Sequence, residues 1–356
     1  MRCDQLYIAG LGSWLPPALS VAEAVARGEW GATAAARSGM RSVTVCTDDT
    51  EAPAEMAVRA AARALERAGM DGSEVDLLLH ASLYDQGNAL WGTASYVQRR
   101  VLPGGGCPAL EVRQVSNGGM AALFLASAVM DPGSEARPRS RQVLVTTADR
   151  FCPPGFDRWH SDPGTVYADG GTAMLLSARE GLARVRSLAL VSDPELEGMH
   201  RAGDPFGVAQ TAPSGVLDLE GHKKRYVDRA GMSFSVARVA AGQRDAVKEA
   251  LADAGVSAAE ISRWVLPHFG RRRLEINCLR PLGIDAEHTA WEFSRRVGHL
   301  GAGDQIAALE HLVFSGALRT GELCVLMGVG AGFTWSCAVV EVVRDPDGMA
   351  SRPLLP

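Results

Sequence analysis

The segment EVRQVSNGGMAALFLASAVM, residues 111–130, places one hydroxyl where it could do chemistry. An extended run from Glu111 to Val115 stops at Ser116, and an asparagine and two glycines then lead into an apolar, helix-like sequence. A strand-to-helix turn of this kind presents a side chain at the positive end of a helix, which suits a nucleophile. Serine is a weak nucleophile unless a base removes its proton. Ser116 is therefore either a nucleophile with a base elsewhere in the chain or a simple N-cap.

A candidate base and its carboxylate lie in RRVGHLGAGDQIAAL, residues 295–309. His299 stands in a glycine-rich turn, and Asp304 opens the helix that follows. Five residues across such a turn can bring a carboxylate onto an imidazole and orient it as a base. The simpler interpretation is an exposed loop histidine followed by an N-cap aspartate.

Two further segments could contribute polar groups. In WVLPHFGRRRLEI, residues 264–276, His268 ends a buried strand and three arginines follow it. In GVGAGFTW, residues 328–335, the glycines let backbone N–H groups approach a ligand closely, as an oxyanion hole requires. The backbone N–H groups of Ser116 and Gly332 are the predicted oxyanion donors.

The elements that must position these residues belong to an α/β protein. Short apolar runs alternate with helical patterns, including an amphipathic helix over 52–69 and a long helix over 234–255. The pattern restarts near Ser177, which predicts two βα halves, 1–178 with the nucleophile and 179–356 with the histidines and Asp304. The weakly patterned stretch 192–230 is interpreted as a surface insertion.

Composition excludes several classes of protein. The chain has 356 residues and a net charge of -5, which disfavours a general nucleic-acid binder. No apolar run reaches the roughly 18 residues of a membrane span, and the N-terminus lacks the pattern of a signal peptide. Seven cysteines are scattered without a CxxC pair. They indicate buried thiols in a reducing cytoplasm, so we expect neither a metal site nor a cofactor.

The motifs, taken together and in order, resemble the 3-oxoacyl-ACP synthase III (ketoacyl synthase III) family of the thiolase superfamily. The resemblance covers nearly the whole chain. It rests on RSGMR, the turn at Ser116, YADGGTAMLLS, LPHFGRRRL, VGHLGAGD and GVGAGFTWS. It implies a five-layered αβαβα thiolase fold, an obligate homodimer and acyl-thioester chemistry.

The departures from the family pattern are informative. The family has Cys where this chain has Ser116, and its catalytic Asn is matched here by His299. The family's His-Gln-Ala-Asn motif reads His268, Phe269, Gly270, Arg271. A hydroxyl needs a stronger base than a thiol does. The replacement of Cys by Ser116, together with that of Asn by His299, therefore predicts a Ser116–His299–Asp304 triad. His268 would remain as a second polar group in the pocket.

The resemblance also implies substrate-binding positions. Arg37 matches a residue near the nucleotide of coenzyme A, and Arg273 matches a basic position at the carrier-docking surface. Leu90 and Trp91 would reach the partner subunit's acyl pocket, where the tryptophan suggests a small acyl chain. Phe269 completes the predicted substrate-binding set. The KKR run at 223–225 is interpreted as a solvated face, and Asp169 as a structural residue that braces a turn.

The predicted function is transfer of a short acyl group from a coenzyme A or acyl-carrier-protein (ACP) thioester, through Ser116, to a carrier protein or to a hydroxyl or amine of a small molecule. Polyketide or other secondary metabolism is the expected setting. One alternative is a starter-unit synthase that condenses a short acyl group with malonyl-ACP. Others are a hydrolase of aberrant acyl carriers and a non-catalytic partner of a related synthase, for which no acyl-enzyme should form.

Overall fold

The computed structural model describes residues 1–48, 50–104, 106–131, 141–203 and 215–346. Nine strands form one mixed sheet in the order β5-β4-β6-β7-β1-β8-β11-β10-β9, and β2 and β3 form a small separate antiparallel sheet. The strands are β1 (Tyr7–Trp14), β2 (Ala18–Ser20), β3 (Ser42–Thr44), β4 (Leu77–Ala81), β5 (Ala109–Val112), β6 (Gln142–Asp149), β7 (Gly170–Ser177), β8 (Ala183–Ser192), β9 (Ile261–Val265), β10 (Leu323–Gly330) and β11 (Thr334–Val342).

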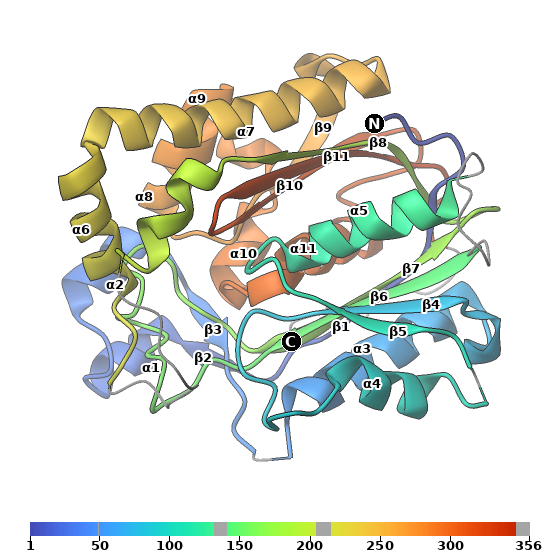
Figure 1. Cartoon of the computed structure of the whole chain (residues 1–356), viewed down its shortest axis with the longest axis horizontal. Coiled ribbons are helices and arrows are strands. Elements are labelled where there is room, and N and C mark those ends of the chain that lie inside the picture. The colour runs from blue at the N-terminus through green and yellow to red at the C-terminus, as the bar shows by residue number, and fades with distance from the viewer. Residues whose placement is uncertain (49, 105, 132–140, 204–214, 347–356) are drawn as a thin grey trace.

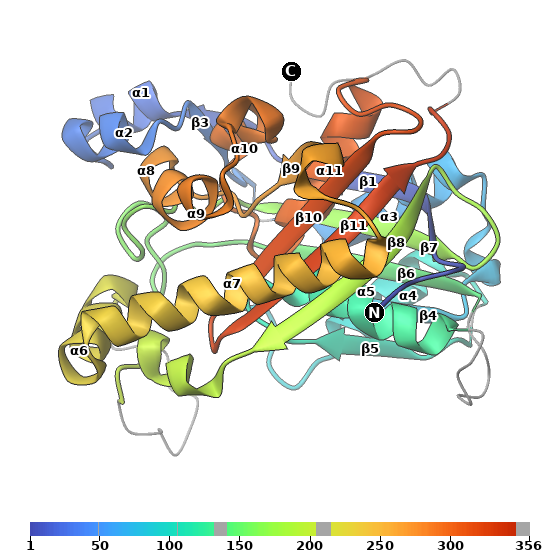
Figure 2. The same cartoon turned by 90° about the horizontal axis from the view of Figure 1, so that it is seen from above.

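The helices complete five layers. They are α1 (Val21–Ala26), α2 (Ala32–Ser38), α3 (Pro53–Ala68), α4 (Thr93–Val101), α5 (Gly118–Met130), α6 (Leu219–Ala230), α7 (Met232–Ala254), α8 (Arg271–Leu274), α9 (Arg280–Leu282), α10 (Trp291–Val297) and α11 (Asp304–Phe314). Figure 1 shows α5 and α11 between the two halves of the sheet, with α3 and α4 outside one half and α7 outside the other. Figure 2 shows α7 running along β8 and β11. This is the thiolase-type αβαβα architecture that the family resemblance implies.

The layers pack closely because small residues face one another. A Cβ on Gly10 of β1 would lie 2.2 Å from the backbone oxygen of Ala64 in α3, and one on Gly12 would lie 2.3 Å from that of Ala60. Only glycine allows the helix to approach the strand so closely. Helix α3 begins at Pro53 and ends at Gly69, which has a left-handed φ of 61°. These residues explain the clear sequence signal of this helix.

The two halves repeat one strand arrangement. In the first half, β1 pairs antiparallel with β7, β7 antiparallel with β6, and β6 parallel with β4. In the second half, β8, β11, β10 and β9 repeat these directions. The boundary predicted between residues 178 and 179 falls in the connection from β7 to β8. The division into two domains at that point stays a prediction.

The interpretation of 192–230 as a surface insertion needs correction. The described part of this stretch contains a 3₁₀ helix, η2 (Pro194–His200), and helix α6. Asp218 caps α6 by accepting a hydrogen bond from the backbone N–H of Gly221 at 2.8 Å. Leu219 and Tyr226 are buried. Residues 204–214 lie outside the described part of the chain.

Among the described residues, none of the helices combines the length and apolar character that crossing a membrane would require.

Candidate active site

The turn that carries Ser116, residues 113–117, joins β5 to α5 at the carboxyl ends of the parallel strands. It is called the nucleophile turn below. Val115 has a φ of 50°, a rare and strained value for a β-branched residue, immediately before Ser116. A Cβ on Gly118 would lie 3.1 Å from the Cβ of Ala302, and one on Gly119 would lie 2.5 Å from the oxygen of Ala302. The two glycines therefore let the start of α5 pack directly against the turn that follows His299.

Two glycines of β10 pack against the same turn from the other side. A Cβ on Gly330 of β10 would lie 2.4 Å from the oxygen of Gln114, and one on Gly328 would lie 2.4 Å from Oδ1 of Asn117. The glycine-rich segment of residues 328–335 thus brings its backbone against the nucleophile turn. Ala331 and Phe333, on either side of Gly332, line the same cavity as Ser116. The role of Gly332 as an oxyanion donor stays a prediction.

The backbone of His299 is held by the YADGG segment. His299 N–H donates to the oxygen of Val166, and Ala168 N–H donates to the oxygen of His299, each at 2.8 Å. The ring of Tyr167 stands edge-on to the imidazole, with the ring centroids 4.9 Å apart. Both the backbone and the ring of His299 are therefore fixed by neighbours from the first half of the chain.

The structure brings Ser116, His299 and Asp304 into a continuous chain of hydrogen bonds. Ser116 Oγ lies 2.9 Å from His299 Nε2, and His299 Nδ1 lies 2.7 Å from Asp304 Oδ2. With Nδ1–H donating to the carboxylate, Nε2 is left as the acceptor for the serine hydroxyl. Asp304 makes no side-chain cap on α11. The simpler interpretation of the sequence, an exposed histidine and an N-cap aspartate, is wrong: both side chains are at least 97% buried.

Burial and neighbouring charges shift the pKa values of His299 and Asp304. Burial alone would lower the pKa of His299, but the Asp304 carboxylate outweighs it and holds that pKa above its ordinary value. Burial likewise opposes the ionisation of Asp304, yet the two histidines and the hydrogen bonds from His299 and the His268 backbone keep its pKa below the usual value. Asp304 Oδ1 also accepts from the N–H of Leu300 at 2.7 Å. The resting state is thus a carboxylate beside an imidazole with raised basicity.

His268 lies behind this pair and is buried. Its backbone N–H donates to Asp304 Oδ2 and its Nδ1 donates to the oxygen of Gly298, each at 2.8 Å. Burial lowers the pKa of His268, which favours the neutral ring. Its Nε2 has no hydrogen-bond partner among the described residues. In this tautomer Nε2 can accept a proton or a hydrogen bond but cannot donate one.

Asp149, at the end of β6, braces the surrounding loops, and the sequence analysis missed it. Its carboxyl accepts from the N–H groups of Leu83 and Tyr84 at 2.8 and 2.7 Å, and from that of Ala302 at 3.2 Å. Burial raises the pKa of Asp149 to about 7. Asp169, interpreted from the sequence as a structural brace, accepts from the N–H groups of Cys46 and Phe151. That interpretation is confirmed.

A cavity of about 560 Å³ opens beside Ser116 and His299. Its volume is in the range of ordinary small-molecule sites. The wall is mainly apolar and aromatic, with rings from Tyr84, Phe151, Phe156, Tyr167, Phe269 and Phe333. Helices α6 and α7 close one side with side chains such as Val227, Val236 and Val239. Phe269 thus lies where a substrate would contact it.

Arg273 lines this cavity instead of the outer surface that the sequence analysis assigned to it. Its guanidinium donates to both carboxylate oxygens of Asp162, at 2.8 and 3.0 Å, and to Thr165 Oγ1 and the oxygen of Pro163 at 2.6 Å. Four hydrogen bonds to the protein leave it little capacity to bind a docking partner. Arg272, beside it, is exposed.

Arg37 is exposed in the last turn of α2. Helix α2 packs against α8, the helix that begins with Arg271. Arg37 therefore lies on a helix that packs against the helix carrying Arg272. A role near the nucleotide of coenzyme A stays a prediction.

Leu90 and Trp91 do not line the cavity of this chain. Leu90 is fully exposed with a φ of 52°, and Trp91 is 38% exposed and contacts the ring of Tyr96. The expectation of a small acyl chain rested on Trp91. Within a single chain, Trp91 sets no limit on the size of the group that the cavity beside Ser116 can hold.

The KKR interpretation holds for two of its three residues. Lys224 and Arg225 are exposed, but Lys223 lines the cavity and forms an ion pair with Asp162. Asp162 was not predicted from the sequence and Lys223 was predicted to be solvated, since only the fold brings the two together. Among the described residues, no cluster of His, Cys, Asp and Glu is arranged to hold a metal ion.

Comparisons with known proteins identify the relatives of this chain. The family described as 3-oxoacyl-ACP synthase III, C terminal, matches residues 251–342. The β-ketoacyl-ACP synthase III of Neisseria meningitidis serogroup A is 26% identical, and the match covers 94% of this chain and 98% of the relative.

Two solved structures extend the comparison. ChlB3, described as an acyltransferase, has a TM-score of 0.87 and 34% identity over 96% of this chain and 99% of its own. The priming β-ketosynthase of the R1128 polyketide pathway has a TM-score of 0.72 and 22% identity over 97% of this chain and 98% of its own, and it shows the shared fold. The chain belongs to the 3-oxoacyl-ACP synthase III family of the thiolase superfamily, a family of acyl-transferring and condensing enzymes.

Proposed function

We propose that this protein is an acyltransferase that carries its acyl group on Ser116. The observation that carries the proposal is the hydrogen-bonded chain from Ser116 Oγ through His299 to the buried Asp304. A serine nucleophile needs a base within hydrogen-bond reach and a third group to orient that base. The geometry supplies all three groups in that order.

In the first half-reaction Ser116 would attack the carbonyl carbon of an acyl thioester. His299 Nε2 takes the hydroxyl proton as the C–O bond forms, and Asp304 stabilises the imidazolium. Backbone N–H groups of Ser116 and Gly332 would hold the oxyanion. The C–S bond then breaks, and the leaving thiolate takes the proton from His299. The products are an ester on Ser116 and a free thiol.

In the second half-reaction an acceptor removes the acyl group. Its hydroxyl, amine or thiol loses a proton to His299, attacks the ester carbonyl and displaces Ser116, which regains its proton. An ester is less activated than a thioester, so the acceptor must be well positioned. The largely apolar cavity beside Ser116 supports this step because it limits competition by water.

The donors and the setting are inferred from the relatives. We propose coenzyme A or carrier-protein thioesters as donors, and a carrier protein or a small molecule as the acceptor. The likeness to ChlB3, described as an acyltransferase, supports acyl transfer, and the likeness to a priming ketosynthase of a polyketide pathway supports a role in secondary metabolism. Exposed Arg272 is the proposed contact for an acidic carrier protein, and exposed Arg37 is the proposed contact for the nucleotide of coenzyme A.

We propose that the protein acts as a homodimer in the cytoplasm. Strand β5 is at one edge of the sheet, and Leu110 on this strand is exposed. Leu90 is also fully exposed, and Trp91 partly so. An apolar edge of this kind favours pairing with another chain. Sedimentation velocity of the purified protein tests the dimer.

Decarboxylative condensation is the second candidate reaction. It needs two hydrogen-bond donors on the enolate oxygen, and the family's Asn is replaced here by His299. The neutral tautomer of His268 supplies no donor at Nε2 either, since its proton is on Nδ1. These observations favour simple acyl transfer. Incubation with malonyl-ACP separates the two reactions, because only condensation releases CO2 and forms a C–C bond.

The decisive experiment is mass spectrometry of the intact protein and its peptides after incubation with acetyl, propionyl, malonyl and longer acyl thioesters. We expect a mass increase on Ser116 that corresponds to the acyl group. His299→Ala should slow acylation by about 10³-fold or more, because it removes the base. Adding a carrier protein or amine should then discharge the adduct.

Ser116→Ala is the matched control, because it removes the nucleophile and leaves His299 and Asp304 in place. An adduct at another residue would contradict the proposal, and so would acylation of Ser116 at an unchanged rate in His299→Ala. The absence of any adduct from coenzyme A or carrier donors would favour the non-catalytic interpretation. Release of free acid without an acceptor would favour the hydrolase.

A further inference from the structure

A second cluster of charged side chains faces the cavity from three elements. Asp162 lies before β7, Lys223 on α6 and Arg273 on α8, and all three line the cavity that also exposes Ser116. Arg273 holds both oxygens of Asp162, and Lys223 Nζ contacts Asp162 Oδ1. The exposed fraction of the side chain is 18% for Arg273, 5% for Asp162 and 20% for Lys223. This is a built polar site in a mainly apolar wall.

The cluster lies close to the proposed catalytic residues. Tyr167 packs edge-on against His299, and its hydroxyl donates to Asp162 Oδ2 at 3.3 Å. One tyrosine side chain therefore spans the distance from the catalytic imidazole to Asp162. A molecule bound at Ser116 and extending along the cavity would pass the cluster.

The charges of the cluster do not balance. Two cations, Lys223 and Arg273, share the single carboxylate of Asp162. His200 also lines the cavity, but burial, followed by the charge of Lys223, lowers its pKa to about 4, so it is neutral and adds no charge. Glu220 is exposed on α6. Burial lowers the pKa of Lys223, and the Asp162 carboxylate opposes that shift. The buried part of the cluster thus has an excess positive charge in a poorly solvated place, which favours an anion.

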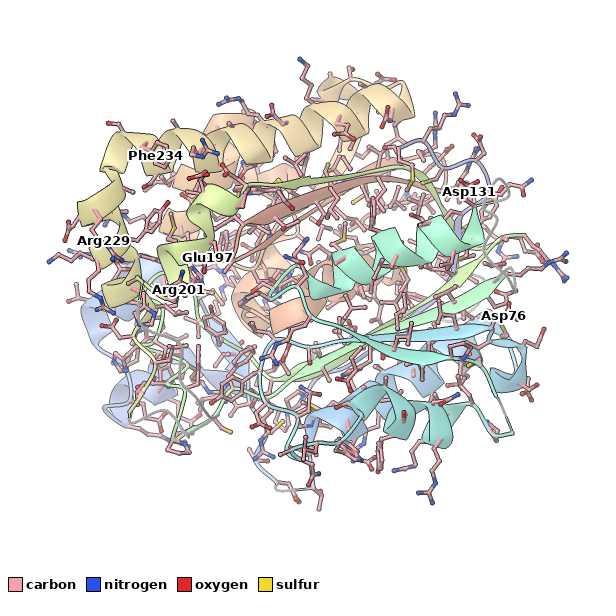
Figure 3. All side chains as sticks on the ribbon, in the orientation of Figure 1. Asp76, Asp131, Glu197, Arg201, Arg229 and Phe234 are labelled. Atoms are coloured by element: carbon pink, nitrogen blue, oxygen red, sulfur yellow. The ribbon has the colours of Figure 1, made fainter. Side chains whose placement is uncertain are left out.

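Lys223 also has unused hydrogen-bond donors. An ammonium carries three N–H groups, and Asp162 is its hydrogen-bond partner among the described residues. Other charged groups nearby are committed elsewhere. Arg229 donates to the oxygen of Ala202, and Glu197 on η2 pairs with Arg201, which follows η2. Figure 3 labels these three side chains near α6. Lys223 is different because it lines the cavity.

We propose that Lys223, supported by Arg273 and Asp162, binds an anionic group of the molecule that enters the cavity. The anion is a phosphate or a carboxylate: the phosphate of the phosphopantetheine arm, or a carboxylate on the acyl group. This inference rests on the proposed acyl transfer for the identity of the ligand. It adds a specificity contact on α6, a helix within the stretch that looks unpatterned in the sequence.

Binding of unreactive analogues tests the inference without requiring acyl transfer. Three S-alkyl thioethers are compared by calorimetry: hexyl-pantetheine, hexyl-phosphopantetheine and 5-carboxypentyl-pantetheine. We expect at least one anionic analogue to bind about 10-fold tighter than the neutral one, because a charge-assisted hydrogen bond is stronger than a neutral one. Lys223→Met should abolish most of that preference, and Lys223→Arg should restore part of it.

Lys224→Met is the matched control, since Lys224 is the exposed neighbour on the same helix. Loss of preference for the phosphate analogue in Lys223→Met identifies the carrier arm, and loss for the carboxylate analogue identifies the acyl group. The inference is overturned if neither anion improves binding, or if the preference survives in a folded Lys223→Met or Lys223→Gln variant. The absence of Ser116 acylation with reactive thioesters would instead refute the proposed function and leave these binding ratios interpretable.

Discussion

Two buried carboxylates near one cavity have different partners. Asp304 is hydrogen-bonded to two backbone N–H groups and to the imidazole of His299, a group whose ordinary pKa is close to neutral pH. Asp162 is held by Arg273 and by Lys223, whose pKa is lowered by burial against the opposing charge of Asp162. The first arrangement can move a proton during a reaction, whereas the second provides fixed charge. The same side chain therefore serves proton transfer in one place and binding in the other.

Among changes to these two carboxylates and the residue that links them, Asp304→Asn should have the largest effect, and it should act on the rate of acylation. The asparagine removes the charge that raises the pKa of His299 and can favour the wrong tautomer. We expect the maximal rate of Ser116 acylation to fall by about 10²- to 10⁴-fold. The rate requires neutral His299, so it falls as pH drops through the raised pKa. In the variant this acid limb should move to lower pH.

Rapid-quench acylation across the pH range gives the measurement. Asp157→Asn is the control, because Asp157 pairs with His160 on the surface, 2.8 Å away. An unchanged acid limb in Asp304→Asn would show that His299 does not carry the titration. An equal loss of rate in Asp157→Asn would show that the effect is not specific to the site.

Asp162→Asn should lower the stability of the folded protein. It leaves Arg273 and Lys223 buried without a counter-charge, so we expect the free energy of unfolding to fall by about 3 kcal/mol. Although burial opposes ionisation, the two cations hold the pKa of Asp162 well below its ordinary value. Its contribution is therefore complete above the unfolded pKa of about 4 and is lost as the pH falls below that value.

Urea unfolding at pH 7 and at lower pH measures this difference. The gap between wild type and Asp162→Asn should shrink on acidification. Glu292→Gln removes an exposed ion pair with Arg295 and should change stability by less than about 0.5 kcal/mol. A gap that stays constant with pH would contradict the role of the Asp162 charge.

Tyr167→Phe should have the smallest effect, because it removes only the hydroxyl that links the two regions. The ring can still pack against His299, while the hydrogen bond of 3.3 Å to Asp162 is lost. We expect stability to fall by about 1 kcal/mol and acylation to change by about 3-fold or less. Tyr167→Leu also removes the ring and should slow acylation further. A loss in Tyr167→Phe as large as that in Asp304→Asn would show that the two regions do not act separately.

Much of the fold could be predicted from local sequence. Helix α3 has an amphipathic pattern, Pro53 at its start and Gly69 at its end, and α7 likewise ends at Gly255. The candidate nucleophile and base were also visible, because Ser116 is in a strand-to-helix turn and Asp304 is five residues from His299 across glycines. In such cases the interacting residues are neighbours in the chain, so their spacing limits their geometry.

Helix α6 and the charged cluster could not be predicted in the same way. Nothing next to Lys223 in the sequence distinguishes it from Lys224, yet one is paired in the cavity wall and the other is exposed. Its partner Asp162 is 61 residues earlier, and Arg273 is 111 residues from Asp162. The direct bond from Ser116 to His299 likewise joins residues 183 apart.

The sequence by itself determined which groups could do chemistry: a hydroxyl, an imidazole and a carboxylate, each in a turn at the end of an element. Only the tertiary structure decided which charges became buried and which faced the cavity. The reason is physical: desolvation and pairing depend on what packs around a side chain, and those neighbours come from distant segments. The same dependence turned one of two adjacent lysines into a candidate binding residue.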